Sequence, residues 1–386
     1  MDTAHARTRR WIVATIAGVA ALTLSQVGPA GAQATGIGDA CRHEARQSAP
    51  FADVSTDGTH AEAVACLWVY NIVRGTTATG ADGFAYQPGE VVNRQQMASF
   101  VAQALDVVLD RHHALPDADA GDAAERFSDG DRISQAHAVN VVRLHDAGVV
   151  DGYPDDTYRP GTAINRAQMA SFLVRAIEDV TGEELPRTAT FDDVDENSVH
   201  AASIEKLASI GVTSGYDGEQ YAPAGDTTRA QMASFVARTL DYLAGEGYLV
   251  PAEYAAHSDG ARIFVADVDA GQHAGYDRAA FRVEGSGDAG WNARYVDEAI
   301  AQGSGHQVEV EGDAILAVTV TGATYPDDAD DIFSDDVTVA GDGIVEVVSG
   351  SVFEGHQQIW VGTTGVHHFE IERTTDGDFY LDVDHS

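Results

Sequence analysis

The sequence predicts a multidomain protein in which an all-α half is followed by an all-β sandwich. Three copies of one helix-loop-helix unit predict the first half, because the phrase around Met97 recurs around Met169 and Met232. Short runs that alternate apolar and polar residues predict the strands of the second half, from residue 259 onward.

The first 32 residues have the organisation of a secretory signal peptide. Arg7, Arg9 and Arg10 precede the apolar stretch 11–24, and small residues at 30–32 offer a cleavage site. The stretch is too short to remain in a bilayer, and no later segment is apolar enough for a membrane helix. We therefore expect a secreted mature chain without a membrane contact. Both Sec and twin-arginine export fit the arginine pair.

Changes in composition and the repeat length set the remaining boundaries. We expect an N-terminal segment at 33–49, repeated units at 50–110, 111–183 and 184–244, a linker at 245–258 and the β half at 259–386.

Each repeated unit is predicted to consist of a helix, a glycine turn, a loop and a second helix. The second helix begins at the repeated phrase, where Asn or Thr followed three residues later by glutamine forms a capping box. The glutamines are Gln96, Gln168 and Gln231. The methionine and phenylalanine of each phrase fall on the apolar face of the helix, so we expect them in the core.

An arginine occupies the first helical position of each copy, as Arg94, Arg166 and Arg229. A cation there opposes the helix dipole at a cost of roughly a few tenths of a kcal/mol, so we expect each arginine to have a partner. Two partners fit, and both can hold at once. One is a carboxylate of a neighbouring unit, and the other is an anionic ligand at the helix N-terminus, where free N–H groups point.

These units resemble S-layer homology repeats, the modules that hold surface proteins on bacterial cell walls. The resemblance rests on the Phe-x-Asp-Val openings at 51–54 and 191–194, the loop Gly-Tyr-Pro-Asp-Asp-Thr-Tyr at 152–158, and the phrase Thr-Arg-Ala-Gln at 228–231. It implies three repeats in a pseudo-threefold bundle, with ligand grooves between them that bind an anionic secondary cell-wall polysaccharide.

The resemblance also implies a set of glycan-binding residues. They are Arg94, Arg166, Arg229, Gln96, Gln168, Gln231, Tyr153, Asp155, Tyr216 and Asp217. The sequence departs from the family pattern in two places, since glutamine replaces the usual glutamate and the usual tryptophan before the first helix's alanine is absent. The identity of the glycan therefore stays open.

Composition restricts the partners further. The formal net charge is −38, and one lysine stands against 22 arginines. Such a chain repels nucleic acid and anionic membranes, so any attraction to an anionic polymer must be local. The acidity is typical of a halophilic source. The two cysteines of an exported chain, Cys41 and Cys66, predict a disulfide that contributes about 3 kcal/mol.

The second half is predicted to form strands at 263–268, 280–284, 308–311, 316–320 and 379–383, whereas 294–299 fits a strand or a helical turn. This half resembles the AMIN-like domain of actinobacterial envelope proteins. The segments that carry the resemblance are 275–281, 290–296, 321–326, 353–355 and 381–384. The family resemblance implies a non-catalytic sandwich that binds envelope glycan or protein.

We find no catalytic or cofactor motif in the sequence, and we expect no metal site. The acidic loop 327–336 fits a solvated surface better than a calcium site, because the EF-hand spacing is missing. His60, His137 and His200 recur where the first helix of each unit begins, and we expect them to cap helices or to lie on the surface.

The sequence thus predicts a secreted, non-enzymatic protein of the cell wall and cell surface, anchored by its repeats. Its expected partner is secondary cell-wall polysaccharide or peptidoglycan, with a possible envelope protein partner for 259–386. Two alternatives remain: a peptidoglycan hydrolase or its targeting subunit, and a structural S-layer component.

Overall fold

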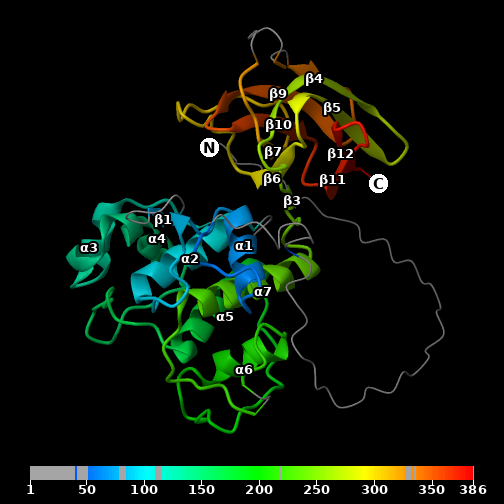
Figure 1. Ribbon diagram of the computed structural model, residues 1–386. Helices are drawn as coiled ribbons and strands as arrows, with labels where there is room; N and C mark the ends of the chain where they lie inside the picture. The colour runs from blue at the N-terminus through cyan, green and yellow to red at the C-terminus, as the bar shows by residue number, and fades with distance from the viewer. Residues whose placement is uncertain are drawn as a thin grey trace, which may run out of the picture. The chain divides into compact units, whose positions relative to one another are not determined.

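The computed structural model describes residues 40, 51–77, 84–108, 115–216, 219–326, 332–333 and 336–385 (Figure 1). The predicted signal peptide 1–32 lies outside the described residues, as do Cys41, Asp217 and most of the acidic loop 327–336. None of the helices in the described part combines the length and the apolar character needed to cross a membrane.

Helices dominate the described residues of the N-terminal half. The α-helices are α1 (Ala61–Val69), α2 (Arg94–Asp106), α3 (Ala123–Arg126), α4 (Gln135–Asp146), α5 (Arg166–Thr181), α6 (Ala201–Ser209) and α7 (Arg229–Gly245). The three long helices α2, α5 and α7 begin at the repeated phrase, and each has the predicted capping box with both of its hydrogen bonds formed. The sequence therefore located these helix starts correctly.

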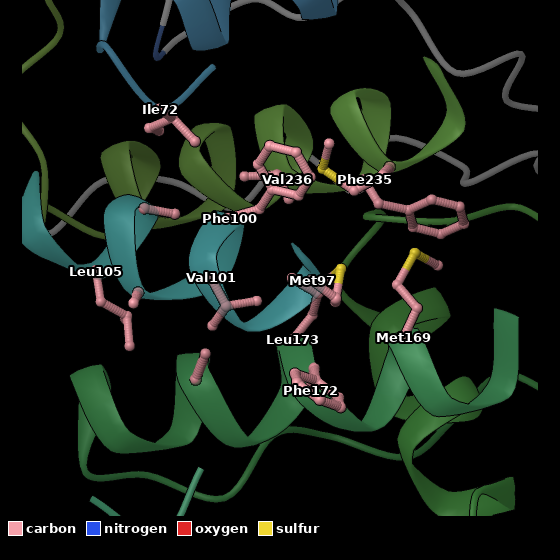
Figure 2. Packing of buried hydrophobic residues seen from close by; sticks show 14 of the residues in the cluster. Ile72, Met97, Phe100, Val101, Leu105, Met169, Phe172, Leu173, Phe235 and Val236 are labelled. Atoms are coloured by element: carbon pink, nitrogen blue, oxygen red, sulfur yellow. The ribbon is translucent and has the colours of Figure 1, made fainter. Parts of the chain in front are cut away.

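The long helices α2, α5 and α7 pack against one another and form the centre of the helical core (Figure 2). Met97 and Val101 of α2, Met169 of α5, and Phe235 and Val236 of α7 project into this region, and all are buried. The predicted core role of the repeated methionine and phenylalanine is confirmed. Deleting such a buried side chain typically costs about 2–5 kcal/mol.

The shorter helices complete a ring of contacts. Each packs against the long helix of the unit before it, so α4 lies on α2 and α6 lies on α5. Helix α1 of the first unit packs against α7 of the last. Every unit therefore has an apolar face covered by another unit, and the first and last units cover each other.

The loop before each long helix is fixed by one aspartate. Both carboxylate oxygens of Asp129 accept backbone N–H bonds, from Tyr158 at 2.6 Å and Arg159 at 2.9 Å. Arg159 has a φ of 57°, a left-handed conformation that costs a non-glycine residue energy and needs such support. Asp53 and Asp193 hold the equivalent tyrosines in the same way.

The C-terminal half contains two antiparallel sheets (Figure 1). The six-stranded sheet has the order β3-β6-β7-β10-β9-β8, and the four-stranded sheet has the order β11-β12-β5-β4. The strands are β3 (Glu253–Ala255), β4 (Arg262–Gln272), β5 (Tyr276–Ser286), β6 (Gly290–Val296), β7 (Ala314–Thr321), β8 (Val337–Thr338), β9 (Ile344–Phe353), β10 (His356–Thr363), β11 (Phe369–Arg373) and β12 (Phe379–Asp384).

The strand predictions were partly correct. Segments 263–268, 280–284, 316–320 and 379–383 lie in β4, β5, β7 and β12, and the ambiguous segment 294–299 begins in β6. The predicted strand at 308–311 does not form. Its alternating valines instead pack beside Trp360 in a small satellite cluster.

The predicted fold class is wrong. The N-terminal half is not all-α, because β1 (Thr76–Thr77) and β2 (Phe84–Ala85) pair in a small sheet and short 3-10 helices lie at Ala120–Asp122 and Gly130–Arg132. Isolated β-bridges, such as Val91 with Thr228, join the units. Ala34–Ser386 also clusters as one compact unit.

Candidate functional site

The arginine at the start of each long helix reaches into the next unit. Nε of Arg94 donates a hydrogen bond of 2.9 Å to the carbonyl oxygen of Tyr158. In return, the hydroxyl of Tyr158 donates a hydrogen bond to the carbonyl oxygen of Arg94 at 3.0 Å. The same reciprocal pair joins Arg166 to Tyr221, and it joins Arg229 of the last unit to Tyr86 of the first.

Aromatic rings surround these guanidinium groups. The guanidinium carbon of Arg94 lies 4.8 Å from the ring centroid of Tyr158, 4.9 Å from that of Tyr153 and 5.6 Å from that of Phe172. Arg94 and Arg166 are buried, and Arg229 is partly exposed. Burial strongly raises the pKa of the tyrosine hydroxyls of Tyr86, Tyr158 and Tyr221, so these groups stay protonated as donors.

The backbone N–H groups at the helix starts already have protein partners. Those of Arg94 and Gln95 donate to the carbonyl oxygens of Thr162 and Pro160 in the next unit, and that of Gln96 donates to the Asn93 side chain. The other two long helices repeat this pattern. One of the two expected partners was an anion held by free N–H groups at the helix N-terminus. Because these N–H groups already donate to protein oxygens, that prediction is wrong.

The second expected partner, a carboxylate, is also missing. Among the described residues no carboxylate pairs with Arg94, Arg166 or Arg229, whose partners are carbonyl oxygens and aromatic faces. These arginines therefore hold adjacent units together.

A cleft of about 250 Å³ opens beside Arg94. It is lined by Arg94, Val149, Val150, Asp151, Gly152, Tyr153, Gln168, Ser171, Phe172, Arg175, Val199 and His200. The lining comes from all three units, which places the cleft where the units meet. Val199 is 88% exposed.

Polar groups of the cleft are held in place by each other. Nε2 of Gln168 donates to the hydroxyl of Tyr153 at 3.3 Å, while its Oε1 completes the capping box. Oγ of Ser171 lies 2.8 Å from Nδ1 of His200. The cleft thus presents an amide, a phenol, an imidazole and two guanidinium groups, a donor set that suits an oxygen-rich anionic ligand.

The second guanidinium, that of Arg175, is more accessible than that of Arg94. Its side chain is 45% exposed, and Nη1 lies 2.7 Å from Oδ2 of Asp151. The main chain of Asp151 also contacts the first guanidinium, because Nη2 of Arg94 donates to its carbonyl oxygen at 3.2 Å. Asp151 therefore touches both cations of the cleft.

The repeated histidines make no side-chain capping bond and are half-buried, so the prediction that they cap helices or lie on the surface is only partly met. His60 and His200 stand at helix N-caps without a side-chain capping bond, and His137 lies inside α4. His137 and His200 contact a serine of the preceding unit, Ser99 and Ser171, and His60 of the first unit contacts Ser234 of the last. Burial lowers the pKa of all three, and nearby arginines lower it further for His60 and His200.

The predicted site residues separate into two groups. Arg94, Gln168 and Tyr153 lie together in the cleft. Asp155 does not, because its carboxylate binds Thr157 and Arg159 within its own loop, which lowers its pKa to about 2.

Equivalent positions carry the remaining predicted residues. Gln96 and Gln231 close capping boxes, and the ring of Tyr216 lies 4.9 Å from the Arg166 guanidinium carbon. Asp217 lies outside the described residues. Cys66 is buried in α1, and its bridge to Cys41 stays a prediction.

Sequence reasoning missed Asp151, Ser171, Arg175 and Val199, and it misassigned His200. One signal was present, since the serine recurs in all three phrases as Ser99, Ser171 and Ser234. The others depend on contacts between units that no local pattern reveals.

Comparisons with known proteins agree with this organisation. Residues 126–170 and 190–233 match the S-layer homology domain, and residues 263–385 match the AMIN-like domain. The two S-layer homology matches fall in the second and third repeated units. The chain therefore contains S-layer homology sequence and an AMIN-like region.

Relatives of this chain include surface proteins and polysaccharide-degrading enzymes. The chain is 26% identical to an S-layer protein of Bacillus thuringiensis subsp. finitimus, over 44% of this chain and 19% of that protein. It is 26% identical to the S-layer protein sap of Bacillus anthracis, over 49% of this chain and 21% of that protein. It is 24% identical to the exoglucanase XynX of Acetivibrio thermocellus, over 51% of this chain and 17% of that enzyme.

The chain spans about a fifth of the length of the first two relatives. The S-layer homology match and the S-layer proteins among the relatives together place this protein outside the cell. It is a secreted protein anchored at the cell wall and cell surface.

Proposed function

We propose that the helical half anchors this protein by binding an anionic secondary cell-wall polysaccharide in the clefts where its units meet. The supporting observation is the cleft beside Arg94, where two guanidinium groups, an imidazole, an amide and a phenol face one space. Several pre-positioned donors around an apolar floor suit a charged sugar, because little side-chain order is lost on binding.

The first unit belongs in this proposal although the family match covers the other two. Its Arg94 forms one wall of the cleft, and its Tyr86 receives Arg229 of the last unit. The first unit thus acts as a third S-layer homology repeat.

We propose that the protein is not an enzyme. The S-layer proteins among its relatives support this proposal. The AMIN-like half then presents a surface to envelope glycan or to another envelope protein.

An alternative is a wall hydrolase or its targeting subunit, which the match to an exoglucanase favours. Zymography of the mature chain on peptidoglycan separates the two functions. A cleared band would replace our proposal with an enzymatic one, and an intact gel is the expected result.

The anchoring proposal is tested by co-sedimentation of the purified mature chain with protein-free wall fragments. We expect sedimentation with walls that carry their polysaccharide, and none with walls from which acid treatment has removed it. Purified polysaccharide should compete. Equal sedimentation with both wall preparations would show binding to peptidoglycan itself and contradict the proposal.

A further inference from the structure

Asp151 holds the position that an anionic ligand of the cleft would need. Its carboxylate lies 2.7 Å from Nη1 of Arg175, and its carbonyl oxygen accepts a bond from Arg94. A charge-assisted contact of this length is what a sugar carboxylate would make with the same guanidinium. We propose that Asp151 is an internal competitor that restricts access of the acidic sugar to this cleft, an inference that rests on the proposed function.

The carboxylate is free to leave. Asp151 is 68% exposed at its side chain and Arg175 is 45% exposed, so water can replace the ion pair at little cost. The carbonyl contact with Arg94 belongs to the main chain and survives when the side chain rotates away. The competitor can therefore withdraw without disturbing the contact between the first two units.

The three repeated units can be compared at the positions of Asp151 and Arg175. The residue before the loop glycine is Asp151 in the second unit, Ser214 in the third and Arg74 in the first. The residue nine positions after the phrase arginine is Arg175, Arg238 and Gln103 in the same order. The third unit therefore keeps the second arginine and carries a serine in place of the acid.

Other charges around Arg175 do not replace Asp151. His200 faces the same space with its pKa lowered by burial, and then by the charges of Arg175 and Arg94, which leaves the imidazole neutral near pH 7. Asp151 is the one carboxylate among the residues that line this cleft. Its removal therefore changes the net charge of the lining by one unit and leaves the cations in place.

The test measures the wall concentration that gives half-maximal sedimentation, with polysaccharide-bearing walls and full mature chains. Asp151→Asn keeps the side-chain shape, and Asp151→Ser reproduces the third unit. We expect both to bind about 1.5- to 5-fold more tightly at low salt, the range for an exposed ion pair, with the gain lost near 1 M salt. Ser214→Asp, the reciprocal change, should weaken binding by a similar factor.

Thermal unfolding confirms that each variant is folded before binding is compared. Unchanged or weaker binding of both Asp151 variants, with the wild type still sedimenting, would overturn the competitor role and leave the anchoring proposal intact. Absence of sedimentation for the wild type and all variants would remove the anchoring proposal, and this inference with it.

Discussion

The buried arginines between units should be far more important for stability than the exposed arginine of the same cleft. Arg94 is 6% exposed and donates to two carbonyl oxygens of the next unit, at 2.9 and 3.2 Å. Losing a hydrogen bond from a charged donor costs about 1.5–3 kcal/mol, and the stacked tyrosines add about 0.5–2 kcal/mol. Because these terms overlap, we expect Arg94→Ala to lower the free energy of unfolding by about 3–5 kcal/mol.

Urea unfolding of the mature chain at pH 7.5, followed by far-ultraviolet circular dichroism, measures this loss. The matched control is Arg175→Ala, which removes a guanidinium from the same cleft. Its ion pair is exposed, so a loss of at most about 1 kcal/mol is expected. If the two variants unfold within 0.5 M urea of each other, roughly the resolution of such a comparison, the structural role assigned to Arg94 is wrong.

Three further predictions concern other parts of the chain. Asp277 accepts buried bonds from the N–H groups of Gly343 and Ile344 at 2.7 and 2.9 Å, so Asp277→Ala should cost about 2–5 kcal/mol in urea unfolding, and Asp277→Asn, which keeps an acceptor, less than half of that. Burial lowers the pKa of His200 in the folded state. As the pH decreases below the unfolded value of 6.5, the unfolded chain binds more protons than the folded one, so the folded state loses stability. The urea midpoint should drop between pH 7.5 and 5.5, and it should drop less in His200→Gln. Finally, Cys41 and Cys66 should resist alkylation in denaturant until a reductant is added, and labelling without reductant would disprove the bridge.

Features whose interacting residues lie within one helical turn could be predicted from the local sequence. The capping boxes at the starts of α2, α5 and α7 join residues three positions apart, so Asn or Thr followed by glutamine sufficed to predict them. The apolar faces of these helices followed from the same spacing.

Partners in another unit could not be predicted in this way. The bond from Arg94 ends on the carbonyl of Tyr158, and every residue has a carbonyl, so no residue type marks the acceptor. His200 likewise contacts a serine from the preceding unit, which a helix-capping rule does not consider. The cleft residues therefore became visible when the units were placed together.

The missing strand at 308–311 has a different cause. Alternation predicts that one side of a segment is buried, and Val308 and Val310 do pack near Trp360. A strand also needs a neighbour with which to exchange backbone bonds. Val308 donates to the carbonyl of Ala299 in a loop, so burial occurs without a ladder.

The contact of α1 with α7 closes the ring of units, so the number of units cannot change without breaking contacts between them. Removing one unit would expose an apolar face on each of its neighbours, and inserting a fourth would separate Arg229 from Tyr86. Gene duplication or engineering can therefore transfer this anchor to other proteins only with all three units together. A single excised unit would expose apolar faces and aggregate.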